Sequence, residues 1–318
     1  TTGTIASSVS GSTNKAAAEI TGDALNFGEE TTLIGTTQEP DINNPGSSYI
    51  INNAADVTLK ITSAGRTRFM KGEINNAGTM EVTSTDHNVR VTDQVAVNNT
   101  GDLTLTATKG DVNFESDYTA GATGHLVLKG TNVLFAGDLT ADSLKFGSAN
   151  SDLTKETNQV VINGTTSNKL NYESNVDVKT LTIEDANTTV NGVLKAAATA
   201  ITDGKQQAGL TVADDYASDN KFVRAAAVSL GDITVGSAAS GATGGTFFTL
   251  TNNAENAVEA SSLTVVKNST TANTFALNAG KFSVGKLTNQ GKVTLTDGEE
   301  FTLTGEGSNA SGAAITLA

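Results

Sequence analysis

The residues that could do chemistry are few, and their spacing keeps them apart. Acidic residues stand next to each other at Asp214-Asp215, Glu29-Glu30 and Glu299-Glu300, among other places. Glycan cleavage needs two carboxylates that face one bond, or a calcium site backed by a basic residue. Neighbours in a strand face opposite sides instead. The sequence therefore predicts no catalytic residue and no enzyme, and a polysaccharide-cleaving enzyme is kept as the catalytic alternative.

The two histidines are the other candidates. His125 follows Asp102 by one period of the repeat described below, and His87 lies close to Arg90. With no cysteine in the chain, two histidines well separated in sequence do not form the ligand set of a transition-metal site. We expect both to be surface residues, with no metal site and no cofactor.

Composition argues against further classes of partner. The chain of 318 residues has 34 acidic and 20 basic residues, a formal net charge of −14, and no cluster of Lys or Arg. No nucleic-acid partner is therefore expected. No stretch approaches the roughly 20 apolar residues of a transmembrane helix, so no membrane span is expected. Because cysteine is absent, stability must come from packing and backbone pairing.

A short repeat stands out between positions 51 and 128. Ile51-Asn52-Asn53 recurs as Ile74-Asn75-Asn76 and as Val97-Asn98-Asn99. A fixed period in this range indicates a repeat architecture. The first asparagines of the three pairs are expected to stack as a ladder of side-chain amides at a turn.

Triplets with the pattern apolar, any, apolar follow the asparagine pairs and continue along the chain. They begin at positions 57, 80, 103, 126, 144, 160, 181, 210, 233, 263, 293 and 315. Outer members of each triplet should point inward, because alternate residues of a strand face opposite sides. Each coil would stack in parallel on the one before it. The pattern predicts an all-β parallel β-solenoid (β-helix) of about 12 rungs, with a mean of roughly 23–24 residues per rung.

Residues 1–50 lack the repeat and are interpreted as an N-terminal cap or connector, with the solenoid over residues 51–318. Thr4, Ile5 and Val9 are expected to form a short strand. The stretch 13–19 looks like an N-cap followed by helical turns. Residues 193–198, within a longer step, are expected to form a loop or a helical turn.

The segments Ile74-Asn75-Asn76-Ala77-Gly78 and Leu287-Thr288-Asn289-Gln290-Gly291-Lys292-Val293-Thr294-Leu295 carry a resemblance. They resemble the β-helical passengers of bacterial autotransporters and are similar to filamentous-haemagglutinin-type exoproteins. The resemblance covers about residues 51–318 and lies in the style of the repeat. It implies a right-handed solenoid in a secreted bacterial protein, located outside the cell or on its surface.

Two functions compete. The first is a structural, non-catalytic subunit of an extracellular filament or surface layer, which assembles with copies of itself. The second is an adhesin that binds a host or neighbouring cell through its loops.

The expected assembly edge is the last triplet. An open solenoid edge offers unpaired N–H and C=O groups to other chains. We expect Ile315, Thr316 and Leu317 to pair head to tail with the strand of Thr4, Ile5 and Val9 in the next subunit.

Overall fold

The computed structural model is built of strands and turns, and the residues that it describes include no helix. They fall into two compact units, Thr1–Asp138 and Leu139–Ala318, which are considered in turn. The described residues are 2–7, 16–22, 25–27, 48–147, 158–171, 174–184, 187–202, 208–216, 221–236, 245–268 and 271–318.

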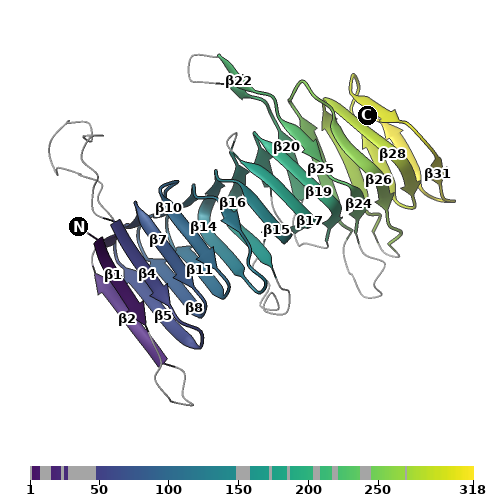
Figure 1. Ribbon diagram of the computed structural model, residues 1–318. Coiled ribbons are helices and arrows are strands. Elements are labelled where there is room, and N and C mark those ends of the chain that lie inside the picture. The colour runs from purple at the N-terminus through teal and green to yellow at the C-terminus, as the bar shows by residue number, and fades with distance from the viewer. Residues whose placement is uncertain are drawn as a thin grey trace. The chain divides into compact units, whose positions relative to one another are not determined.

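The first unit stacks coils of three strands in parallel. One column is a four-stranded sheet of β1 (Thr2–Ser7), β4 (Ser48–Asn53), β7 (Gly72–Asn76) and β10 (Val95–Asn99). The second column contains β2 (Ala16–Gly22), β5 (Val57–Ser63), β8 (Thr79–Ser84), β11 (Asp102–Ala107) and the start of β14 (His125–Phe135). The third contains β3 (Leu25–Phe27), β6 (Thr67–Phe69), β9 (Val89–Val91), β12 (Val112–Phe114) and the end of β14. The short strand β13 (Tyr118–Thr119) precedes β14. Figure 1 shows the first two columns as rows of arrows in purple and blue.

Alternation along each strand builds the core. In β11, Leu103 and Leu105 are buried while Thr104 between them is half-buried. Leu103 lies beside Met80 of β8 and beside Leu126 of β14. Each such aliphatic contributes about 1.5–3 kcal/mol on burial, and it does so only because the neighbouring coils cover it. The predicted inward stacking of the triplets at 80, 103 and 126 is confirmed.

The register of the first triplet is a correction. Leu59 lies beside Met80 and Ile61 beside Val82, so the triplet that stacks here starts at position 59 instead of position 57. The asparagine pairs keep a constant spacing, but this coil reaches its second strand with a different connection length. Counting from the asparagine pairs therefore puts the start of the stacked triplet in the next strand at the wrong residue.

The N-terminal segment supplies a coil of the same kind. β1 pairs with β4, β2 with β5 and β3 with β6, all in parallel. The helical turns expected near residues 13–19 are wrong over the part that is described, because Ala16–Gly22 is strand β2. Pairing with β5 along the whole of this strand supplies backbone partners that outweigh a local helical preference.

Asparagine side chains form two parallel ladders at the turn after the first column. The predicted outer ladder is confirmed: Asn75 Nδ2 donates to Asn52 Oδ1 over 3.0 Å, and Asn98 Nδ2 to Asn75 Oδ1 over 2.8 Å. The second residue of each pair makes an inner ladder that the sequence did not reveal. Asn53 donates to Asn76, and Asn76 donates to Asn99, each over 2.8 Å. The inner amides also donate to backbone carbonyls, so each turn is held from within.

Tyr118 ends the inner ladder. Asn99 Nδ2 donates to the Tyr118 hydroxyl over 3.1 Å, and the Tyr118 ring packs edge-on against Phe114. Burial raises the pKa of the Tyr118 phenol to about 12, an effect that the Asn99 hydrogen bond partly offsets. A raised folded-state pKa means that the unfolded chain loses this proton first as the pH rises.

We therefore expect an alkaline loss of stability that depends on Tyr118. The contribution is intact below pH 10, where both states keep the proton, and disappears as the pH passes 10 and approaches 12. The loss attributable to this group should be about 1 kcal/mol by roughly pH 11. Urea unfolding of the wild type and of Tyr118→Phe across the alkaline range checks this. The variant should be less stable at neutral pH and less sensitive to alkali, and parallel pH curves for the two proteins would contradict it.

The second unit repeats the parallel pattern in two columns of strands. The first holds β15 (Leu139–Gly147), the start of β16 (Gln159–Leu170), β17 (Asn175–Glu184), β19 (Val193–Ile201), β23 (Ala227–Ser229), β24 (Asp232–Val235), β26 (Val258–Val265), β28 (Lys281–Asn289), β30 (Glu300–Leu303) and β31 (Gly307–Asn309). The second holds the end of β16, β18 (Asn187–Val190), β20 (Ala208–Val212), β25 (Phe247–Asn252), β27 (Thr274–Ala279), β29 (Lys292–Leu295) and β32 (Ala314–Leu317). An antiparallel hairpin, β21 (Asp215–Tyr216) and β22 (Phe222–Arg224), extends beyond the neighbouring strands (Figure 1).

The single ladder of triplets expected in this unit is wrong. The triplets at 181, 233 and 263 share the first column, but those at 210, 293 and 315 belong to the second. Residues 193–198, expected as a loop or helical turn, lie in β19, and residues 199–201 supply the triplet that was missed. Both columns carry the same apolar alternation, so spacing alone could not separate them. The predicted fold class is confirmed: the chain is an all-β parallel β-solenoid.

Candidate functional site

β32 carries three of the residues expected at the assembly edge. Ile315 lies beside Val293 and Leu317 beside Leu295 in β29, the one strand paired with β32 among the described residues. Val293 is buried, whereas Ile315 is 50% exposed and Leu317 is 79% exposed. The apolar side of this strand, which in earlier coils is covered by the next coil, is therefore accessible.

Backbone direction shows which groups of β32 face outward. The N–H groups of Ala314 and Ala318 donate to carbonyls of Gly291 and Leu295. Alternation in a strand directs the Thr316 N–H toward β29 as well, and directs the N–H groups of Ile315 and Leu317 away from it. A proline at position 316 would thus break the native pairing, whereas a change at position 315 or 317 alters the edge itself.

The remaining residues of the expected edge lie in the other unit. β1 is the first strand of its four-stranded sheet, and Thr4 and Ile5 pair with Ile50 and Ile51 of β4. Val9 lies outside the described residues. Within the described chain, each edge is thus a parallel strand paired on one side, which is the geometry that accepts a further strand.

The acidic pairs do not converge. Asp214 is buried, and its two carboxylate oxygens accept the N–H groups of Ala226 and Glu255, each over 2.9 Å. This carboxylate therefore ties the base of the β21–β22 hairpin to the turn before β26. The Glu299 carboxylate accepts the N–H of Gly280, and Glu29-Glu30 lies outside the described residues. In the described pairs, these hydrogen bonds hold turns of the chain.

His125 and Asp102 meet as their spacing indicates. His125 Nδ1 lies 2.7 Å from Asp102 Oδ1, and the pair joins β14 to β11. His125, expected at the surface, is half-buried: its side chain is 16% exposed and its Nε2 is buried without a hydrogen-bond partner. The pair bridges two coils and has no nucleophile attached to it by any described contact.

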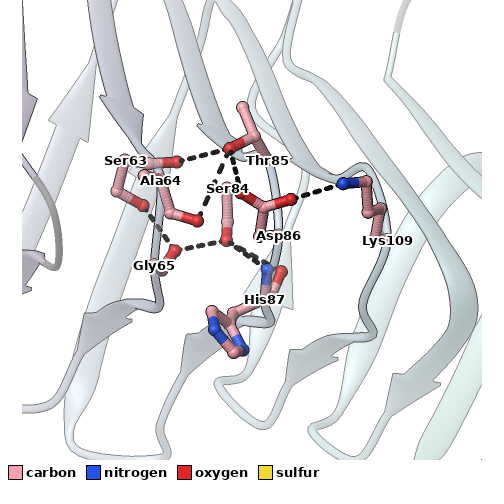
Figure 2. Close-up of polar contacts among 8 residues, drawn as sticks. All are labelled: Ser63, Ala64, Gly65, Ser84, Thr85, Asp86, His87 and Lys109. Atoms are coloured by element: carbon pink, nitrogen blue, oxygen red, sulfur yellow. Dashed lines mark hydrogen bonds and ion pairs between the residues drawn. The ribbon is translucent and has the colours of Figure 1, made fainter.

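A second cluster contains the residue types of a hydrolase triad, in a different geometry (Figure 2). The Ser84 hydroxyl lies within hydrogen-bond distance of the backbone carbonyls of Gly65 and His87, either of which can accept its one proton. The His87 ring, exposed as expected, points away from that hydroxyl. Asp86 Oδ1 accepts from Lys109 Nζ over 2.6 Å. The Lys109 ammonium holds the pKa of the Asp86 carboxyl below its usual range, and the carboxylate raises the pKa of Lys109 in turn. The cluster ties successive turns together and leaves Ser84 without a base.

A groove of about 350 Å³ opens on the second unit, close in the chain to the hairpin. The hairpin carries Phe222, 50% exposed, and Val223, 49% exposed. The groove arises where β23 and β26 diverge, since Ser229 beside Glu259 is the one register pair between them. Its lining residues are Val193, Leu194, Lys195, Ala227, Val228, Ser229, Asn256, Ala257 and Glu259.

Sequence reasoning missed the groove and the hairpin. The hairpin lies between the triplets at 210 and 233, whose spacing fits one ordinary coil step, and no motif marks the hairpin or the groove. The signal that was present is the apolar pair Phe222-Val223 flanked by Lys221 and Arg224, in a region otherwise rich in Asp and Ala.

No group of three or more His, Asp or Glu side chains among the described residues is placed to hold a metal ion. The same part of the chain contains no helix with the length and apolar character needed to span a membrane. No family model, curated protein or solved structure matches this chain.

Proposed function

We propose that the protein is a structural, non-catalytic subunit of an extracellular assembly, a filament or surface layer, and that copies join by stacking coil on coil. The observation that carries the proposal is the parallel stacking of coils in both units, a pattern that a further coil can extend. Ile315 and Leu317 occupy positions whose counterparts in the preceding coil face the core, yet both are largely exposed. Exposed apolar positions on an unpaired strand edge favour association with another strand.

The edge in the first unit suits the same contact. The coil of β1, β2 and β3 pairs in parallel with the coil that follows it. A coil stacked on β30, β31 and β32 would extend the same parallel pattern. Because the two surfaces differ, the contact is heterologous and propagates as a fibre unless it closes into a ring.

The described polar clusters support a structural role. The Asp214 carboxylate, the His125–Asp102 pair and the turn around Ser84 all hold turns or coils of this chain. A glycan-cleaving enzyme would need carboxylates that share one face. Release of reducing ends or unsaturated sugars from a polysaccharide panel would contradict this part of the proposal.

The assembly is tested with a pair of substitutions on one strand. Leu317→Lys places a charge at the apolar edge, whereas Thr316→Lys places the same charge on the opposite face of β32. Because Leu317 is already 79% exposed, its replacement should leave the fold intact. We expect fibres from the wild type and from Thr316→Lys, and folded monomers from Leu317→Lys, by sedimentation velocity and electron microscopy. A wild type that stays monomeric at high concentration, or unchanged fibres from Leu317→Lys, would overturn the proposal.

The hairpin supports the second candidate, an adhesin that binds a cell surface. Phe222 and Val223 are about half exposed on a projecting element that lies close to the groove in sequence. Loops that project from a scaffold are common binding sites. Replacing both by Ser should abolish binding to target cells and leave sedimentation unchanged if this function holds. Cell binding that persists in this variant counts against it.

A further inference from the structure

Lys145 is a buried lysine in a position where the repeat expects an exposed residue. It is the middle residue of its triplet, yet it is only 9% exposed, and Val161 beside it in β16 is fully buried. Its Nζ lies 2.5 Å from Glu184 Oε2, and the two side chains are 11% and 19% exposed. The Glu184 carboxylate is therefore a base within reach of the Lys145 ammonium.

Asn163, on the neighbouring strand β16, is a buried polar group without an explanation. It is 8% exposed, and both atoms of its side-chain amide are buried without a hydrogen-bond partner. Buried amides in proteins are nearly always hydrogen-bonded, so an orphaned amide needs a reason. The buried amides of the inner asparagine ladder in the first unit have a structural role, and they are hydrogen-bonded to one another.

Strand register brings the three residues to one face. β15 lies between β16 and β17: Lys145 pairs with Val161 on one side and with Thr182 on the other. Glu184 lies beside Gly147, and Asn163 follows Ile162, the partner of Phe146. Asn163 and Glu184 therefore flank Gly147, two positions along from Lys145. Residues offset by two in neighbouring strands face the same side within reach of a long side chain.

Position 147 requires glycine. Its φ is +128°, and a Cβ built there would meet the carbonyl oxygen of Glu184. β15 therefore contributes no side chain between Asn163 and Glu184. Lys145 lies on the same face of β15, and its long side chain is the one from this strand that can approach both Asn163 and Glu184.

We propose that Lys145 and Asn163 form an intramolecular isopeptide bond, with Glu184 as the proton-transfer group. The Glu184 carboxylate takes a proton from the Lys145 ammonium, and the neutral Nζ attacks Cγ of Asn163. The new Nζ–Cγ bond forms, Glu184 passes its proton to Nδ2, and the bond from Cγ to Nδ2 breaks so that ammonia leaves. The second proton that Nζ loses on becoming an amide nitrogen passes to Glu184, which ends neutral. Atoms balance without an oxidant or a cofactor.

The bond would link β15 covalently to β16 in a chain that has no cysteine and so no disulfide. It would remove both the buried charge of Lys145 and the unpaired amide of Asn163. The inference is independent of the proposed assembly, because it concerns one coil of one chain.

Mass spectrometry of the folded, purified protein tests the proposal. The linked chain is lighter than its sequence by one ammonia, about 17 Da, and a digest should contain one branched peptide joining the segments around Lys145 and Asn163. The unlinked control is protein that has been held in urea since its synthesis. Its mass should equal that of the full sequence.

Two variants separate this bond from a side reaction. Asn163 precedes Gly164, and an Asn-Gly step can also lose ammonia by closing to a succinimide. Lys145→Arg keeps the positive charge beside Glu184 but removes the amine, so its mass should match its full sequence. Glu184→Gln should fold, as checked by circular dichroism, and show at least a tenfold slower loss of ammonia. Full mass in the wild type, ammonia loss that persists in Lys145→Arg, or an unchanged rate in Glu184→Gln would overturn the proposal.

Discussion

Leu126→Asp is expected to destabilise the protein by roughly 4–5 kcal/mol, or to prevent folding. Leu126 in β14 is fully buried, and its register partner Leu103 is 1% exposed. A carboxylate at this position would have apolar neighbours within a stacked core and no partner for its charge. The measurement is the midpoint of urea unfolding followed by far-ultraviolet circular dichroism.

Val127→Asp is the matched control, because it introduces the same side chain at the next position. Val127 faces the other side of β14, beside Thr104, and is only half-buried. Its replacement should cost about 1 kcal/mol, in the range of ordinary strand preferences. Equal losses from the two variants would show that the inward and outward faces of this strand are assigned wrongly.

Asn76→Ala is expected to cost roughly 3–4 kcal/mol, although it removes no apolar surface. The Asn76 amide accepts from Asn53 and donates to both Asn99 Oδ1 and the Asp102 carbonyl, over 2.8 and 3.0 Å. Its loss leaves buried polar groups of two other coils unsatisfied at once, which is more costly than losing an exposed hydrogen bond.

Asn75→Ala provides the comparison at the adjacent residue. Asn75 belongs to the outer ladder, where its amide bonds to Asn52 and Asn98 and water can replace either partner. We expect a loss of about 0.5–1 kcal/mol. The free energies of unfolding of both variants come from urea titrations at neutral pH. An Asn75 variant as unstable as the Asn76 variant would mean that the two ladders contribute equally.

The sequence by itself determined that the chain forms stacked parallel coils and where several of them lie. Regularly spaced asparagine pairs and apolar alternation need only the local rules of a strand and a turn. When coils of similar length stack, residues of the same type lie next to one another in successive coils. The outer ladder of Asn52, Asn75 and Asn98 follows directly from that spacing.

Only the tertiary structure decided which strands are neighbours. Leu210 and Leu181 carry the same kind of triplet, yet they belong to different columns, and Leu181 pairs with Thr199 instead. Every face of a coil needs an apolar inner side, so the pattern is the same on each face. The connections between strands differ in length, and their lengths, unlike the strand pattern, are not set by a local rule.

The side chains brought together by coil closure were also beyond the sequence. Nothing in the order of residues shows that Lys145 is buried beside Glu184, because the two lie far apart in the chain on strands whose pairing the repeat did not reveal. The same holds for Asp214, whose carboxylate meets backbone groups of two separate turns. The alternation of apolar and polar residues in the sequence indicates which side of its own strand a residue faces. What lies across from that side is decided by the strand that pairs next to it, and that pairing exists only in the folded chain.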